Sequence, residues 1–273
     1  MQYATARGHR WDAGSASRCR GRCWRLPAVR LGVCALLVAC GGRQGSAAHG
    51  ASHSASDSAS DSEGRAADHA SGMKKTQRTA DAHLGTRAPG TGLDLGTPAP
   101  TASVRDLEGK RVPLEEIWRD GPALLVFYRG GWCPYCNWQL HQLSETYDAF
   151  VSRGLSIAAI SVDRVANAAA LAEARSLPFP VFSDAKLAAH RAFRVVHELD
   201  SDTVAKLQGY GIDVQAASGE AHQSIAVPAV FIIGRLAGAP PAVHFVHSDN
   251  DYATRPDPDQ LLDLFDRLSI DKP

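Results

Sequence analysis

Two patterns of apolar residues alternate along the chain from about residue 93 onward. Short continuous apolar runs indicate buried strands, and apolar residues that recur every three or four positions indicate helices. The strand-like runs are "ALLVFY" (123–128), "LSIAAISVD" (155–163), "FPVFSD" (179–184), "AVPAVFIIG" (226–234) and "AVHFVHSD" (242–249). Helical patterns occur after Cys136, over 166–176, over 185–193, and near the end of the sequence in "PDQLLDLFDRL".

This alternation of strands and helices predicts a βαβ core with a partly parallel sheet. The last two strand-like runs are close together, so we expect them to form a hairpin. The stretch "TASVRDLEGKRVPLEEIW" adds two short strands around a turn at Glu108 and Gly109, while residues 194–222 show no regular pattern. The predicted fold class is α/β, with a mixed central sheet and helices on both faces.

The amino-acid composition before residue 93 is different. Residues 40–92 are dominated by Ala, Ser, Gly, Asp and His and contain few large apolar side chains. Such a segment buries too little surface to offset the entropy of ordering, so we expect a disordered tether. The folded domain is expected over 93–273.

Residues 1–39 have the features of a targeting segment. They hold seven arginines and one acid, and the apolar run 31–39 is too short to span a bilayer as a helix. The run fits a secretory signal peptide, and its end, "LVAC", resembles a bacterial lipoprotein signal in which Cys40 is acylated. This resemblance implies a protein anchored by lipid in the cell envelope, facing the periplasm, with no other membrane attachment.

Charge and cysteine content narrow the function classes. The 29 basic and 29 acidic residues cancel, so charge gives no indication of a nucleic-acid partner. Of the six cysteines, cleavage before Cys40 would remove three and lipid would occupy Cys40 itself. The predicted domain then keeps only Cys133 and Cys136, and one close pair points to chemistry rather than to a disulfide-stabilised scaffold.

The pair Cys133 and Cys136 lies in "FYRGGWCPYCNWQL", where a predicted strand meets a predicted helix. Free amides and the helix dipole stabilise an anion at such a place and lower the pKa of a cysteine. Arg129 adds positive charge nearby, and no acidic residue lies between Arg129 and Glu145. The pattern predicts a redox-active pair. Zinc sites usually have four ligands and no second pair is present, so we expect no metal and no other cofactor.

"WCPYC" looks like the active site of the thioredoxin fold, and "VPAVFII" resembles that fold's cis-proline strand, in which Pro228 would face the disulfide. From residue 93 onward the chain resembles the peroxiredoxin-like branch of the alkyl hydroperoxide reductase/thiol-specific antioxidant family. That family carries Pro-x-x-x-Thr/Ser-x-x-Cys. Here its peroxidatic cysteine matches Cys136, its threonine matches Cys133, and its proline matches Arg129.

The resemblance implies a hydroperoxide as substrate and a thioredoxin-like or other dithiol as reductant. Arg255, in "YATRPDP", would approach the thiolates, while Trp132 and Tyr135 would shape the surface around them. In thioredoxins the attacking cysteine matches Cys133 instead. Because Cys133 precedes the helix, we expect it to be the more exposed thiol and the low-pKa thiolate toward protein disulfides.

Two alternatives stay open. A thioredoxin-like oxidoreductase would use Cys133 to attack a substrate disulfide and Cys136 to resolve the mixed disulfide. A copper-binding assembly protein would also be an anchored thioredoxin fold. Proteins of that kind carry Cys-x-x-x-Cys and a distal histidine, and the spacing here is one residue shorter.

Overall fold

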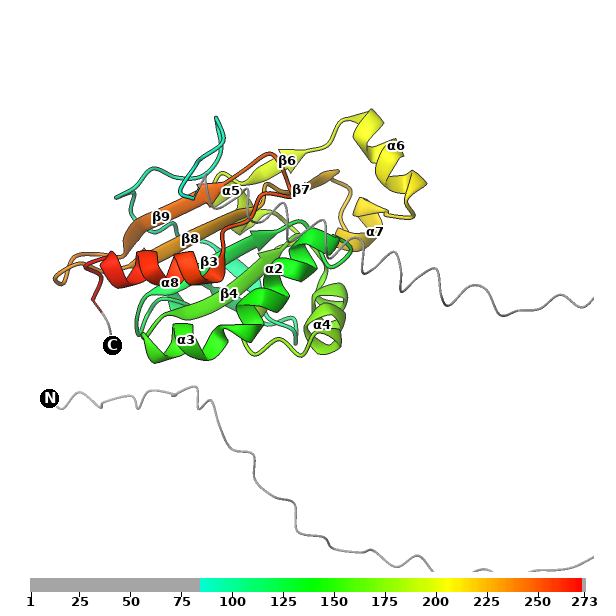
Figure 1. Cartoon of the computed structure of the whole chain (residues 1–273). Coiled ribbons are helices and arrows are strands. Elements are labelled where there is room, and N and C mark those ends of the chain that lie inside the picture. The colour runs from blue at the N-terminus through cyan, green and yellow to red at the C-terminus, as the bar shows by residue number, and fades with distance from the viewer. Residues whose placement is uncertain (1–83, 272–273) are drawn as a thin grey trace, which may run out of the picture. The chain divides into compact units, whose positions relative to one another are not determined.

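A seven-stranded mixed sheet forms the centre of the computed structural model, which describes residues 84–271 (Figure 1). Its strand order is β2-β1-β5-β4-β3-β8-β9. The strands are β1 (Ser103–Arg105), β2 (Arg111–Pro113), β3 (Ala123–Tyr128), β4 (Ser156–Ser161), β5 (Val181–Ser183), β8 (Ala229–Gly234) and β9 (Ala242–Ser248). Strands β3, β4 and β5 are parallel to one another, and the other neighbours pair antiparallel. The predicted mixed sheet and the β8–β9 hairpin are confirmed.

Helices cover both faces of this sheet, as the sequence predicts. Alternate side chains of β3 point to opposite faces, and all six of its residues are buried. One face packs under α2 (Pro134–Glu145), α3 (Tyr147–Ser152), α4 (Val165–Ala174) and α8 (Pro258–Arg267). The other face packs against α5 (Ala188–Ala192) and the 3-10 turn η1 (Leu114–Glu116).

The region without a clear sequence pattern, together with the residues that follow it, folds into two short helices and a separate two-stranded sheet. It contains β6 (Val196–Glu198), α6 (Ser201–Gly209), α7 (Val214–Ser218) and β7 (Ser224–Ala226), with β6 and β7 paired as a separate two-stranded sheet. Asp200 and Asp213 cap the two helices through backbone N–H groups at their first turns. Helix α6 has nine residues and helix α7 has five, so neither is long enough for a helical repeat of apolar residues to be recognised in the sequence.

The predicted strand 226–234 is divided at Val227 and Pro228. Strand β7 ends at Ala226 and β8 begins at Ala229, because proline has no N–H to donate to a ladder. The Val227 N–H donates to the Val195 carbonyl at 2.8 Å. The Pro228 carbonyl accepts from the Asp249 N–H at 3.3 Å.

Ordered structure begins before the predicted boundary at residue 93. The Ala88 N–H donates to the Ser248 carbonyl at 2.9 Å, and the Ser248 N–H donates to the Thr86 carbonyl at 3.0 Å. The Gly92 N–H donates to the Arg194 carbonyl at 2.8 Å. Residues 84–92, which the sequence analysis placed in the tether, are therefore attached to the domain by backbone hydrogen bonds to Ser248 at the end of β9 and to Arg194, which their polar composition did not reveal.

The predictions for residues 1–83, including the signal segment, Cys40 and most of the tether, lie outside the described residues. Within residues 84–271, no helix is long and apolar enough to cross a membrane.

Candidate active site

The loop between β3 and α2 brings the cysteine pair to the edge of the sheet. Gly130 in this loop has φ of +148°, a conformation that favours glycine. A Cβ at this position would collide with the Trp132 indole and lie 2.9 Å from Asp163 Oδ1. The loop therefore passes so close to these two side chains that only glycine fits, and the turn leads directly into the cysteine-bearing helix.

Cys133 is the N-cap residue of α2, and Pro134 occupies the first helical position. The Cys136 N–H donates to Cys133 Sγ at 3.4 Å, and the Asn137 N–H donates to the Cys133 carbonyl at 3.0 Å. Both cysteines are free thiols and both are buried, with exposed fractions of 1% for Cys133 and 0% for Cys136. Contrary to expectation, Cys133 is not appreciably more exposed than Cys136, because both cysteines belong to the buried hydrophobic cluster between the sheet and α2.

Arg255 reaches the cysteine pair from the segment between β9 and α8. Its Nη2 donates to Cys136 Sγ at 3.4 Å, and its Nη1 donates to the Thr254 carbonyl at 3.3 Å. The Arg255 residue is itself buried, at 3% exposed. The predicted approach of Arg255 to the sulfurs is thus found in the structure, and it is directed at Cys136.

The two thiols differ in their electrostatics. Burial opposes a charge on Cys136, but a hydrogen bond from Cys133, the Arg255 charge, and the backbone and charge of Arg129 lower the pKa of Cys136 to about 6. The hydrogen bond to Cys136, burial and the Cys136 charge raise the pKa of Cys133. The expectation that Cys133 is the low-pKa thiolate is therefore wrong. Cys133 is the proton donor of the pair because the nearest guanidinium faces Cys136.

Aromatic rings surround the guanidinium of Arg129. Its central carbon lies 5.1 Å from the centroid of the Trp132 ring and 4.4 Å from that of the Tyr252 ring. Tyr135 packs edge-on against Tyr252, with ring centroids 5.4 Å apart. Trp132 and Tyr135 thus belong to one aromatic group with Tyr252, a residue that the sequence analysis did not select. Their role in shaping the surface around the thiols stays a prediction.

Pro228 shares a small cavity of about 50 Å³ with Arg129 and Tyr252. The structure therefore brings the predicted proline to the same side of the site as Arg129. The cis state of the Val227–Pro228 bond stays a prediction.

Asp163 is a second site residue that the sequence analysis missed. Its Oδ2 accepts from the Gly131 N–H at 2.7 Å, and the residue is 1% exposed. Burial raises the pKa of Asp163 to about 6, against hydrogen bonds from Gly131 and Ser161, and the Cys136 charge adds to this rise. A signal existed, because "LSIAAISVD" ends in an acid and parallel strands deliver their carboxyl ends to the same sheet edge.

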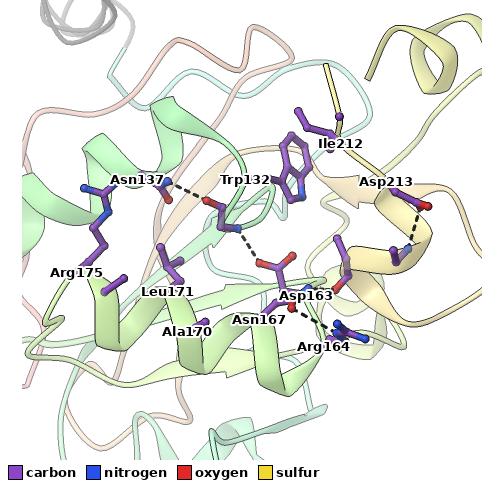
Figure 2. A pocket seen from close by; sticks show the side chains of 15 residues that line it. Trp132, Asn137, Asp163, Arg164, Asn167, Ala170, Leu171, Arg175, Ile212 and Asp213 are labelled. Carbon is purple, nitrogen blue, oxygen red and sulfur yellow. Dashed lines mark hydrogen bonds between the residues drawn. The ribbon is translucent and has the colours of Figure 1, made fainter. Parts of the chain in front are cut away.

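A larger pocket of about 590 Å³ opens beside Asp163, between α2, α4 and the segment that precedes α7 (Figure 2). Figure 2 shows the Asp163 carboxylate directed at the Gly131 backbone, with the Trp132 indole also at the pocket. Asn137 also lines this pocket, and its Nδ2 donates to the Gly131 carbonyl at 2.9 Å. Within residues 84–271, no cluster of three or more His, Cys, Asp or Glu side chains is arranged to hold a metal ion.

Comparison with known proteins agrees with this architecture. The model of the AhpC/TSA family matches residues 95–237, which is more than half of the chain. The chain belongs to the AhpC/TSA family. The family predicted from the cysteine motif and the strands around it is confirmed, and the thioredoxin-like fold with it.

Curated relatives of this AhpC/TSA chain include two kinds of thiol enzyme. Thiol-disulfide oxidoreductase ResA of Bacillus cereus is 29% identical over 93 residues, covering 34% of this chain and 53% of the relative. The chloroplastic peroxiredoxin Q of Triticum aestivum is 30% identical over 103 residues, covering 36% and 47%. The chain spans about half the length of the curated relatives it matches.

Among solved structures, reduced Prx3 of Vibrio vulnificus in complex with H2O2 has the same fold. It superposes with a TM-score of 0.51 at 15% identity, covering 63% of this chain and 98% of that one. The chain is therefore a member of the AhpC/TSA family with a thioredoxin-like fold.

Proposed function

We propose that this chain is a thiol-dependent peroxidase that reduces hydroperoxides with Cys136 as the attacking thiolate and Cys133 as the resolving thiol. The observation that carries the proposal is the Arg255 guanidinium, which donates to Cys136 Sγ at 3.4 Å. A thiolate is the nucleophilic form of cysteine, and with a pKa of about 6 Cys136 is largely ionised at pH 7. Arg255 is also placed to donate to an oxygen that approaches this sulfur.

The reaction balances with the groups present and an external dithiol. The Cys136 thiolate attacks the terminal oxygen of the peroxide, the O–O bond breaks, and Cys136 becomes a sulfenic acid. The leaving alkoxide takes the proton of Cys133, with which Cys136 is hydrogen-bonded. The Cys133 thiolate then attacks the sulfenic sulfur, hydroxide leaves and takes up a proton as water, and the Cys133–Cys136 disulfide forms. A dithiol reductant, itself oxidised to a disulfide, restores both thiols.

The relatives named ResA favour a second candidate, a thioredoxin-like oxidoreductase that acts on protein disulfides. Burial of both sulfurs argues for the peroxide, because a small peroxide displaces fewer covering atoms than a protein disulfide does. The loop before β8 adds to this argument. The Val227 N–H and the Pro228 carbonyl both have internal partners, so neither is free to pair with a substrate peptide.

Stopped-flow mixing of the reduced chain with peroxide tests the proposal. Cys136→Ser abolishes rapid peroxide consumption, while Cys133→Ser retains the first turnover and leaves a sulfenic acid at Cys136 that dimedone traps. Mass spectrometry after one equivalent of peroxide locates the adduct. An adduct at Cys133 in Cys136→Ser, with none at Cys136 in the other variant, contradicts the proposal and favours the disulfide oxidoreductase.

We further propose that the enzyme works at the cell envelope, held by lipid on Cys40. The support is the arginine-rich start, the short apolar run and the "LVAC" sequence. In that location the domain would meet peroxides on the periplasmic side of the membrane.

A further inference from the structure

The guanidinium of Arg129 is a largely buried cation, and among residues 84–271 no carboxylate pairs with it, although its charge acts on Cys136. Arg129 is 9% exposed and lies between the rings of Trp132 and Tyr252. Within residues 84–271, its guanidinium has no hydrogen bond and no ion pair with another side chain or with a carbonyl. Ring faces attract the charge but satisfy none of the five N–H donors of a guanidinium, and a buried charge normally has a hydrogen-bonded partner.

The cavity next to Arg129 is suited to a small anionic group. It has a volume of about 50 Å³, which is enough for a group of a few heavy atoms and too small for a whole organic substrate. His197 and Asn250, whose side chains can donate hydrogen bonds, line it together with Arg129, and none of its lining residues is an aspartate or glutamate. A planar guanidinium binds a carboxylate through two parallel hydrogen bonds.

The cavity also adjoins the reactive centre. Arg129 lies in the cysteine loop four positions before Cys133, and its backbone and charge both act on the Cys136 sulfur. Tyr252, which covers the guanidinium, is 45% exposed, so the outer wall of the cavity lies at the protein surface. A molecule with its anionic group at Arg129 would therefore be held beside the cysteine loop.

We propose that the Arg129 cavity binds the carboxylate of a small-molecule substrate of the cysteine pair. This inference rests on the proposed function and names the substrate class. The same carboxylate chemistry has two sources: an acid that carries the hydroperoxide group, or an acid that carries the thiol of the reductant. Each places a carboxylate on Arg129 and its reacting atom at the sulfurs.

Binding is tested first, without any turnover. The reduced full chain is titrated with benzoate, and with benzamide as the uncharged analogue, while the ¹⁵N signal of the Arg129 side chain is followed by NMR. Benzoate shifts the signal in a saturable way and benzamide does not. The variants are compared by calorimetric titration, which does not depend on the Arg129 signal: Arg129→Gln loses saturable binding of benzoate, whereas Arg111→Gln, which removes the same charge from an exposed position on the edge strand β2, keeps it. Absence of a saturable shift at Arg129 overturns the proposal.

Kinetics then identify the source of the carboxylate. In the oxidative arm, linoleic acid hydroperoxide is compared with its methyl ester. In the reductive arm, the oxidised chain is reduced by 3-mercaptopropionate or by its methyl ester. The wild type prefers the acid over the ester by about tenfold or more in one arm, as a charge-assisted bidentate pair predicts, and Arg129→Gln abolishes that preference. The quantity compared is the ratio of the rate with the acid to the rate with the ester, because the loss of the Arg129 charge also slows the reaction of Cys136 with both substrates.

Two further variants keep the test independent of folding and of the proposed function. Arg129→Lys retains the positive charge without the planar guanidinium, so it keeps part of the preference for the acid over the ester. His197→Gln, at an exposed residue, weakens this preference about threefold. A wild type that prefers the acid in neither arm overturns the inference. If neither peroxide reacts rapidly but benzoate still binds at Arg129, the peroxidase proposal fails and the carboxylate site stands.

Discussion

Arg255 and Cys136, 119 positions apart in the sequence, meet in the site with Nη2 of the arginine 3.4 Å from the sulfur. The contact selects one thiol of the pair. Cys136 is stabilised as an anion, while Cys133 keeps its proton and donates it toward Cys136. Because the contact joins the first turn of α2 to the segment before α8, the polarity of the cysteine pair depends on how the C-terminal part of the chain packs.

Replacing Arg255 by Met should raise the pKa of Cys136 above its value of about 6. The reactive thiolate is present above the pKa and is lost as pH falls through it, so the variant loses its activity at a higher pH. We expect a fall of about 10- to 100-fold in the second-order rate with peroxide at pH 6, and a smaller fall at pH 9. The pH dependence of Cys136 alkylation measures the shift directly. Arg153→Gln, which removes a pair with Asp266 and a hydrogen bond to the Ala149 carbonyl away from the cysteines, should leave the profile unchanged. An identical profile in both variants would refute the role of Arg255.

Asp163→Asn should change stability in a pH-dependent way. Burial raises the pKa of Asp163 to about 6 from 3.8, so ionisation of the buried carboxyl costs stability. The cost is absent below about pH 4 and complete above about pH 6. A pKa difference of about two corresponds to at most about 3 kcal/mol. The free energy of unfolding of the variant relative to the parent chain should therefore increase by up to that amount between pH 4 and pH 8.

Urea unfolding at the two pH values measures this gain. The comparison is made in a Cys136→Ser background, which removes the charge coupled to Asp163. A difference between variant and parent that stays constant with pH would contradict the assignment.

Phe231→Ala should destabilise the sheet on which the site is built. Phe231 is fully buried in β8, and its ring contacts those of Phe127 at 5.8 Å and Phe193 at 4.9 Å between centroids. The lost burial and the remaining cavity should cost about 3–5 kcal/mol of unfolding free energy, measured with urea. Tyr210→Ala removes an aromatic ring that is 69% exposed and should stay within about 0.5 kcal/mol. Equal losses in the two variants would show that the aromatic contacts around Phe231 contribute little.

Cys40→Ser should release the protein from the membrane fraction. The reason is the sequence "LVAC", which predicts cleavage before Cys40 and attachment of lipid to this residue. Metabolic labelling with a radioactive fatty acid, followed by fractionation, measures both effects. Cys34→Ser, which changes a cysteine inside the apolar run, serves as control and should keep label and location. Recovery of the wild-type chain without label would exclude the anchor.

Local patterns in the sequence were enough to predict the core of the fold. The apolar run 123–128 and the helical spacing after Cys136 depend only on which side chains follow one another, and both elements are found as predicted. The position of Cys133 and Cys136 at the start of a helix follows from the same patterns. The short helices α6 and α7 were missed, because nine and five residues carry too little periodicity.

The sequence by itself thus determined the sheet, the family and the place of the cysteine pair, whereas tertiary structure decided the chemistry of each sulfur. Position in the helix favoured Cys133 as the thiolate, but Arg255 arrives from the distant C-terminal segment and faces Cys136. Burial of Asp163 and the enclosure of Arg129 by Trp132 and Tyr252 also arise only when separate elements pack together. Charge stability depends on solvent exclusion and on distances through space, and neither quantity is contained in the local order of residues.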